Sequence, residues 1–207
     1  MSQTEKPLIL IIDDDEALRR SMAFLIATIG LDCLGFDNAE HFLRETPQPG
    51  RPGCILLDVR MPGMSGLELL RILRERGSVL PVLMITGHGD VPMAVAALKA
   101  GADDFIEKPF NDQHLLDAIT VAVRTSSQRL ADSIDRDRIV ERAAALSARE
   151  REVLWLVMAG KPNKVIAFEL GLSIKTVELH RHSLMEKMQV GSVAELACQV
   201  TLAGLGS

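Results

Sequence analysis

Side chains capable of phosphate and metal chemistry stand where short apolar segments end. Five of them follow four such segments: Asp13, Asp14, Asp58, Thr86 and Lys108. Each segment is typical of a buried parallel strand, and open α/β sheets bind their ligands at the carboxyl ends of the strands. Asp58 directly follows the apolar run at residues 54–57. Its position predicts a phosphoryl acceptor within a phosphate-and-metal site.

This chemistry requires a cation. An aspartate accepts a phosphoryl group only where the charge of that group is neutralised, and Mg²⁺ or Mn²⁺ held by carboxylates would do so. Lys108 would approach the phosphate as a point charge, and the hydroxyl of Thr86 would donate a hydrogen bond to it. The structural alternative, helix capping by the run of aspartates, fits Asp15 but leaves the other strand ends unexplained. The predicted metal ligands are Asp13, Asp14 and Asp58.

The spacing of apolar residues predicts the elements that position this site. Up to residue 124, short apolar runs alternate with amphipathic stretches of helical period. The predicted strands are residues 8–12, 31–36, 53–57, 81–85 and 103–106, and the predicted helices are residues 15–29, 38–45, 65–76, 90–100 and 111–124. Because βαβ crossovers are nearly always right-handed, this alternation predicts an α/β fold with a doubly wound, five-stranded parallel sheet, as in flavodoxin-like proteins.

The pattern changes after residue 124. Residues 125–145 are charged and contain neither Gly nor Pro, which is typical of a stiff connector with helical tendency. From residue 146 no strand pattern appears, and four helices fit residues 147–159, 162–170, 174–188 and 192–203. The predicted organisation is an α/β domain at residues 5–124, a linker at 125–145 and an all-α domain at 146–205.

Two of the C-terminal helices form a predicted helix-turn-helix. Ser147 and Glu150 have the spacing of a capping box, and further on a short helix, a turn and a longer helix follow one another. In DNA-binding motifs of this kind the second helix enters the major groove. Arg181 and Glu178 would read bases, and the lysines and Thr176 would hold phosphates; alternatively, these residues are only solvated faces of a small bundle. The predicted DNA contacts are Lys164, Lys175, Thr176, Glu178, Arg181 and His182.

The composition of the chain limits the classes of function that it can have. The net charge of −5 divides into −6 for residues 1–124 and +1 for residues 125–207, so only the second part tolerates nucleic acid. With six Phe, one Trp and no Tyr, base stacking on aromatic platforms is not favoured. The three cysteines lack metal spacing and predict small buried apolar side chains. No signal-peptide or membrane-spanning pattern is found, and a cytoplasmic protein without a membrane partner is expected.

Residues 5–124 resemble the receiver domain of bacterial two-component response regulators. The strand-end residues match that family's acidic pair, phosphorylated aspartate, switch hydroxyl and lysine, and Asp-Val-Arg-Met-Pro-Gly and Thr-Gly-His-Gly-Asp are most similar to its FixJ-type subgroup. The resemblance implies phosphorylation of Asp58 by a sensor histidine kinase and a switch aromatic at Phe105. It also implies a metal ligand at the backbone carbonyl of Arg60 and a cis peptide bond between Lys108 and Pro109.

Residues 146–205 resemble the LuxR-type DNA-binding domain. The match includes Leu-Ser-x-Arg-Glu, Asn-Lys-x-Ile-Ala and Thr-Val-x-x-His, and it departs from the family at Pro162, which suits a first helical position. Together the resemblances imply a response regulator transcription factor, not an enzyme, that binds promoter DNA and works with RNA polymerase. Phosphorylation would pair two receivers through apolar residues near helix 90–100. The candidates for this homodimer surface are Val91, Met93, Val95 and Leu98.

Two other functions remain open from the residues alone. A phosphohydrolase also uses a strand-end aspartate with Mg²⁺, but it needs a second acid two residues later, where this chain has Arg60. A phosphorelay shuttle or protein-interaction module would keep the receiver, while its C-terminal bundle would not bind DNA. Binding of promoter DNA with and without a phosphate mimic separates these functions.

Overall fold

Five apolar segments form one parallel sheet in the computed structural model, which describes residues 6–45, 50–87 and 91–205. The strands lie in the order β2-β1-β3-β4-β5. All residues of β1, β3 and β4 are buried, because helices cover both faces of the sheet. The α/β prediction is therefore confirmed. The strands are β1 (Leu8–Ile12), β2 (Asp32–Phe36), β3 (Gly53–Asp58), β4 (Val82–Thr86) and β5 (Asp104–Glu107).

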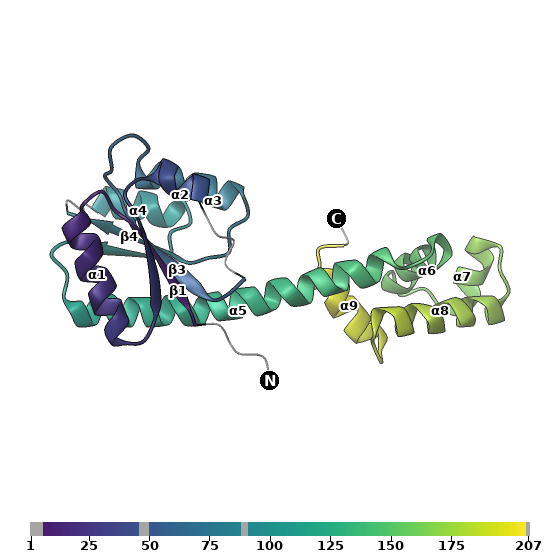
Figure 1. The fold of residues 1–207 in the computed structure, drawn as a ribbon. Helices are drawn as coiled ribbons and strands as arrows, with labels where there is room; N and C mark the ends of the chain where they lie inside the picture. Colours follow the sequence, from purple (N-terminus) through teal and green to yellow (C-terminus); the bar gives the residue numbers. More distant parts are fainter. Residues whose placement is uncertain (1–5, 46–49, 88–90, 206–207) are drawn as a thin grey trace. The chain divides into compact units, whose positions relative to one another are not determined.

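Helices cover the sheet in two layers, as Figure 1 shows. Helices α2, α3 and α4 pack on one face, and α1 and the N-terminal part of α5 pack on the other. This placement follows from crossovers that alternate between the two faces of a doubly wound sheet. The helices are α1 (Glu16–Thr28), α2 (Ala39–Glu45), α3 (Gly66–Glu75), α4 (Val91–Lys99) and α5 (Asp112–Ala144).

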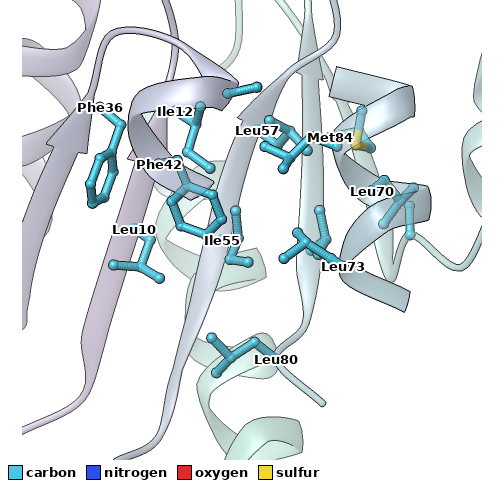
Figure 2. Packing of buried hydrophobic residues seen from close by; sticks show 14 of the residues in the cluster. Leu10, Ile12, Phe36, Phe42, Ile55, Leu57, Leu70, Leu73, Leu80 and Met84 are labelled. Atoms are coloured by element: carbon cyan, nitrogen blue, oxygen red, sulfur yellow. The ribbon is translucent and has the colours of Figure 1, made fainter. Parts of the chain in front are cut away.

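Strand alternation divides the apolar side chains between two cores. Successive residues of a strand point to opposite faces, so Ile12 enters the core under α2–α4 whereas Ile11 enters the core under α1 and α5. Figure 2 shows the first core, in which the rings of Phe36 and Phe42 meet edge to face with centroids 5.2 Å apart. The sheet is thus packed on both faces and positions the residues at its ends.

Glycine brackets β3 at both ends. A β-carbon at Gly53 would lie 1.9 Å from the carbonyl oxygen of Leu8, and one at Gly66 would lie 2.1 Å from the carbonyl oxygen of Asp58. No side chain fits at either position, because the backbones approach too closely. The start of α3 consequently lies directly against the end of β3 that carries Asp58.

The second unit, residues 132–207, is all-helical in the part that the structure describes, up to residue 205. The predicted capping box is present: Ser147 Oγ accepts a hydrogen bond from Glu150 N at 3.2 Å, and Glu150 Oε2 accepts one from Ser147 N at 2.7 Å. Apolar side chains from each of its helices meet in one core. In addition to the C-terminal part of α5, its helices are α6 (Ala148–Met158), α7 (Asn163–Leu170), α8 (Ile174–Met188) and α9 (Val193–Leu202).

The largest difference from the expected elements concerns α5. The sequence predicts a helix at residues 111–124 and then a stiff connector of helical tendency at 125–145. The helical tendency is confirmed, but the two segments form a single helix, Asp112–Ala144. Because residues 125–145 contain neither Gly nor Pro, nothing interrupts the backbone hydrogen bonding of this helix up to Ala144. The first unit, residues 1–131, ends within this helix. Although α5 has 33 residues, no helix in the described part of the chain is long and apolar enough to cross a membrane.

Candidate functional site

Three of the strand-end residues converge at the carboxyl edge of the sheet. Asp13 follows β1, and Asp58 is the last residue of the adjacent strand β3. The ammonium of Lys108, which follows β5, donates hydrogen bonds to both: its Nζ lies 2.8 Å from Asp13 Oδ2 and 2.7 Å from Asp58 Oδ1. These residues form one ion-paired cluster.

Backbone groups fix the orientation of both carboxylates. Asp13 is 2% exposed and Asp58 is 6% exposed. Their second oxygens accept hydrogen bonds from the backbone: Asp15 N lies 2.9 Å from Asp13 Oδ1, and Arg60 N lies 2.8 Å from Asp58 Oδ2. Since each carboxylate oxygen can accept two hydrogen bonds, both side chains keep capacity for a further ligand.

Burial sets the electrostatics of the cluster. Burial raises the pKa of Asp58 above its ordinary value, and the hydrogen bond and charge of Lys108 offset this only in part. Burial alone would lower the pKa of Lys108, but the hydrogen bonds and charges of Asp13 and Asp58 outweigh it, so that pKa is raised. Lys108 is therefore cationic at neutral pH. One ammonium faces two buried carboxylates, and a second cation would stabilise the site.

Thr86 and Phe105 lie on the two strands beside the cluster. Thr86 ends β4 and is 1% exposed, and its carbonyl oxygen accepts a hydrogen bond from Lys108 N at 2.7 Å. Phe105 is paired with Met84 in the sheet register and packs, partly buried, against the core under α2–α4. The peptide bond between Lys108 and Pro109 is cis, as the resemblance implied. Both predicted switch residues thus belong to strands that end near Lys108.

The oxygen donors of this cluster suit a hard divalent cation. Within the described ranges, no three His, Cys, Asp or Glu side chains are grouped so that they could hold a metal ion. Mg²⁺ does not require such a group, because it keeps several waters and binds through one or two carboxylates. Asp13 and Asp58 already face a common cation, the Lys108 ammonium, and so fit the ion. Asp14 and Arg60 are exposed beside them.

Arg19 also contacts the strand-end cluster, although the sequence did not predict it as a site residue. Its Nη1 donates a hydrogen bond to the carbonyl oxygen of Asp13 at 2.6 Å and so holds the loop that follows β1. Asp15 caps α1, with its Oδ1 accepting hydrogen bonds from Ala17 N and Leu18 N at 2.9 and 3.1 Å. A basic residue one turn after this cap is the signal that would have identified Arg19.

The exposed face of α8 carries most of the predicted DNA contacts. Lys175, Glu178 and His182 are exposed, opposite the side chains that enter the core. Leu179 shares this face and is 63% exposed, although it was not predicted. An aliphatic residue among charged ones was the available signal. Lys164 is exposed on the neighbouring helix α7.

Thr176 and Arg181 are engaged within the domain. Ser173 caps α8 by accepting a hydrogen bond from Thr176 N at 3.0 Å, and the two hydroxyls lie 2.8 Å apart. The guanidinium of Arg181 donates to Asn163 Oδ1 at 2.9 Å and thereby links α8 to α7. Base reading by Arg181 stays a prediction, and such a contact would compete with this hydrogen bond.

Only some of the apolar residues predicted for the dimer surface are exposed. Val95 is 42% exposed and Leu98 is 49% exposed on α4, whereas Met93 packs partly buried against the core. Val91 begins α4, and its side chain lies outside the described residues. The exposed apolar area of α4 therefore centres on two of the four predicted residues.

Comparison with protein families identifies both parts of the chain. Residues 9–120 match the response regulator receiver domain, and residues 144–200 match the bacterial regulatory proteins of the luxR family. The chain therefore belongs to the response regulators that control transcription, with a receiver domain followed by a LuxR-type DNA-binding domain.

Two relatives match along nearly the whole chain. The transcriptional regulatory protein FixJ of Azorhizobium caulinodans is 45% identical over 195 residues, covering 94% of this chain and 92% of FixJ. The response regulator protein TodT of Pseudomonas putida is 43% identical over 189 residues, covering 91% of this chain and 83% of TodT. The domain order is thus shared along the chain.

Solved structures agree with this assignment. The response regulator StyR matches with a TM-score of 0.79 and 41% identity, covering 95% of this chain and 98% of StyR. Full-length FixJ from B. japonicum matches with a TM-score of 0.58 and 42% identity, covering 99% of this chain and all of that protein. The receiver fold and the C-terminal helical domain both have experimental counterparts.

Proposed function

We propose that Asp58 accepts a phosphoryl group from a sensor histidine kinase. The observation that carries this proposal is the hydrogen-bonded cluster in which Lys108 Nζ contacts both Asp13 and Asp58 at the ends of adjacent strands. Receiver domains generally bind Mg²⁺, and here Asp13, Asp14, Asp58 and the carbonyl oxygen of Arg60 would hold the ion. When bound, the ion neutralises charge on the transferring phosphoryl group.

The protein side chains position and neutralise the reacting atoms. A carboxylate oxygen of Asp58 attacks phosphorus, the bond between phosphorus and the kinase histidine breaks, and the imidazole leaves with its electron pair. Lys108, held as a cation, stabilises the added negative charge. Thr86 then moves toward the phosphate, and its hydroxyl donates a hydrogen bond to a phosphoryl oxygen. Phe105 moves with Thr86, and this shifts the packing near α4.

Labelled acetyl phosphate and Mg²⁺ test the acceptor in the full-length protein. We expect Asp58→Asn to lower hydroxylamine-sensitive phosphate incorporation by about 100-fold or more, because the amide is not a usable nucleophile. Asp15→Asn is the matched control, since asparagine also caps a helix, and it should retain normal incorporation. Equal labelling of Asp58→Asn and the wild-type protein would refute the assignment.

We propose that α8 enters the major groove of promoter DNA. Lys175, Glu178 and His182 would face the DNA because they share the exposed face of this helix, with Lys164 contacting a phosphate from α7. Thr176 would contribute a phosphate contact at the start of α8. Leu179 adds an apolar side chain to the same surface.

Salt-dependent binding to a promoter duplex tests this face. We expect Lys175→Ala to weaken binding about tenfold and to reduce the salt slope by roughly 0.9, because one phosphate contact is lost. Arg138→Ala is the control, since Arg138 is a 63%-exposed residue of α5 paired with Asp135. An unchanged salt slope in Lys175→Ala would argue against this contact.

We further propose that phosphorylation pairs two receivers through α4. Val95 and Leu98 supply the exposed apolar area, and Met93 and Val91 would extend it. Leu98→Glu should prevent beryllofluoride-induced dimers in analytical ultracentrifugation, because it places a charge in the interface; a dimer that persists would contradict this surface. The dimer would act with RNA polymerase in the cytoplasm, and the domains would span residues 5–124 and 146–205, joined by residues 125–145.

A phosphorelay shuttle without DNA binding is the less favoured alternative. The luxR-family match at residues 144–200 and the exposed basic residues of α8 both support DNA binding instead. A phosphohydrolase is also disfavoured, because Arg60 occupies the position where that class requires a second acid.

A further inference from the structure

The edge of the sheet opposite Asp58 holds a second charged cluster. Asp103 precedes β5, Arg74 belongs to α3 and Arg129 belongs to α5. Asp103 Oδ2 accepts a hydrogen bond from Arg74 Nη2 at 3.1 Å, and Asp103 Oδ1 accepts one from Arg129 Nη2 at 2.5 Å. Two helices are thus tied to one carboxylate at the start of β5.

Asp103 also joins the two strands that carry the switch residues. Its Oδ2 accepts a hydrogen bond from Val82 N, at the start of β4, and its own N–H donates to the Val82 carbonyl oxygen, both at 2.9 Å. β4 ends at Thr86, and β5 contains Phe105. A shift of β4 relative to β5 therefore alters the position of the Asp103 carboxylate.

The same turn of α5 has a second attachment, at the start of β3. Ser126 is 2% exposed, and its Oγ accepts a hydrogen bond from Gly53 N at 3.1 Å. Arg129 Nη1 additionally donates to the carbonyl oxygen of Val79 at 3.3 Å. Ser126 and Arg129 are three residues apart and so lie on one face of the helix. The beginning of the segment between the two domains is thereby docked on the receiver.

The attachment made by Arg129 is polar and partly exposed to water, and this makes it switchable. Arg129 has a side chain that is 40% exposed, so its hydrogen bonds can be exchanged for water at little cost. Its planar fork also demands a defined carboxylate position. By contrast, Leu115 and Ile119 earlier in α5 are completely buried and remain packed on the sheet.

We propose that Ser126, Arg129 and Asp103 form a clamp that reports the phosphorylation state of the receiver to residues 125–131. The inference rests on the proposed phosphorylation of Asp58, which acts on the carboxyl ends of β4 and β5, while the clamp grips the amino ends of the same strands. Short strands within a packed sheet move as rigid elements, so a displacement at one end reaches the other.

Hydrogen exchange of the full-length wild-type protein gives the first test. With beryllofluoride and Mg²⁺ as the phosphate mimic, we expect exchange of amides 125–131 to change about fivefold or more, while amides 115–122 stay unchanged. If the mimic binds and changes DNA affinity, but exchange at residues 125–131 is unaltered, the clamp is refuted. If the mimic does not bind at all, it is the proposed function that fails.

Arg129→Ala gives the second test, with Arg138→Ala as the matched control. The readout is the ratio of DNA affinities with and without beryllofluoride, on a duplex selected from a random pool by the full-length protein with the mimic. We expect Arg129→Ala to reduce this ratio about fivefold and Arg138→Ala to leave it unchanged. A wild-type ratio in Arg129→Ala overturns the proposal. If that variant does not fold, Arg129→Lys, which keeps the charge but loses the fork, must lower the ratio for the proposal to stand.

Discussion

Asp58 of the receiver and Glu150 of the DNA-binding domain look alike but behave in opposite ways. Both are buried, and each accepts a hydrogen bond from a lysine at 2.7 Å: Asp58 from Lys108 and Glu150 from Lys187. The pKa of Asp58 is raised, mainly by burial, whereas hydrogen bonds, above all those of Lys187 and Ser183, lower the pKa of Glu150 to about 2.

The opposite pKa shifts follow from the number of hydrogen-bond donors that each carboxylate does not share with another acceptor. Glu150 accepts hydrogen bonds from Ser183 Oγ at 2.6 Å and from Ser147 N at 2.7 Å in addition to its lysine. Within the described residues, Asp58 shares its lysine with a second carboxylate and also accepts a hydrogen bond from the N–H of Arg60. The fully satisfied carboxylate of Glu150 links α6 to α8, whereas the incompletely neutralised carboxylate of Asp58 suits the proposed binding of phosphate and metal.

Removing the satisfied carboxylate should have the largest effect on stability. Glu150→Ala leaves Ser183 and Lys187 without their partner and is expected to destabilise the C-terminal domain by about 3 kcal/mol. Trp155, the single tryptophan of the chain, lies in α6, so its fluorescence in urea reports on this domain. Glu150→Gln keeps part of the network and should lose less. A loss below about 1 kcal/mol would contradict the comparison.

Protonation of Glu150 and of Asp58 in acid should change the free energy of unfolding in opposite directions. The pKa of Glu150 in the folded protein, about 2, lies below its ordinary value of 4.5, so its stabilisation is present above pH 4.5 and is lost as the pH falls toward 2. The full loss is at most about 3 kcal/mol. Asp58, with a raised pKa, contributes in the other direction and destabilises the folded state when ionised. Urea unfolding of Glu150→Gln, followed through Trp155, should be less pH-dependent than that of the wild-type protein; equal dependence would exclude this role.

Removing the unsatisfied carboxylate should increase stability. Asp58→Asn deletes a buried charge and retains an oxygen that can accept from Arg60 N, so we expect the receiver to be stabilised by on the order of 1 kcal/mol. Exchange of the buried amides of β1 and β3 measures this gain. Asp14→Asn, at an exposed carboxylate, serves as the control. If Asp58→Asn proved less stable than the wild-type protein, the charge of Asp58 could not be unfavourable.

The smallest effect should come from a surface ion pair whose N–O distance equals that of the two buried lysine contacts. Arg149 Nη1 lies 2.7 Å from Glu152 Oε2, but the side chains are 54% and 46% exposed. Glu152→Gln should change stability by less than about 0.5 kcal/mol in the same urea assay, because water screens the pair and replaces it. A larger loss would show that distance, and not burial with added donors, governs these contacts.

The strand-end cluster was predictable because its signal is local in the sequence. Each of its residues follows an apolar run, and the geometry of a parallel sheet then brings those ends together. The capping residue Ser147 was equally predictable from its three-residue spacing to Glu150. What these features share is that secondary structure alone places them.

Other contacts depend on packing that no local pattern encodes. The pairing of Arg181 with Asn163 joins two helices, and the attachment of Arg129 to Asp103 spans 26 residues. An arginine on an amphipathic helix has the same local pattern whether it contacts DNA, solvent or a neighbouring helix. The continuity of α5 past residue 124 is hidden for a different reason: the charge-rich composition of residues 125–145 indicates a connector, whereas their helix propensity extends the helix.

Gly53 and Gly66 have a consequence for how this chain can evolve. Neither bears a functional group, yet a single added carbon at either would collide with backbone at the two ends of β3. In a library of random variants selected for transcriptional output, both positions should be as intolerant as Asp58, the proposed phosphoryl acceptor. Selection would therefore preserve these glycines as strictly as Asp58, for a purely steric reason.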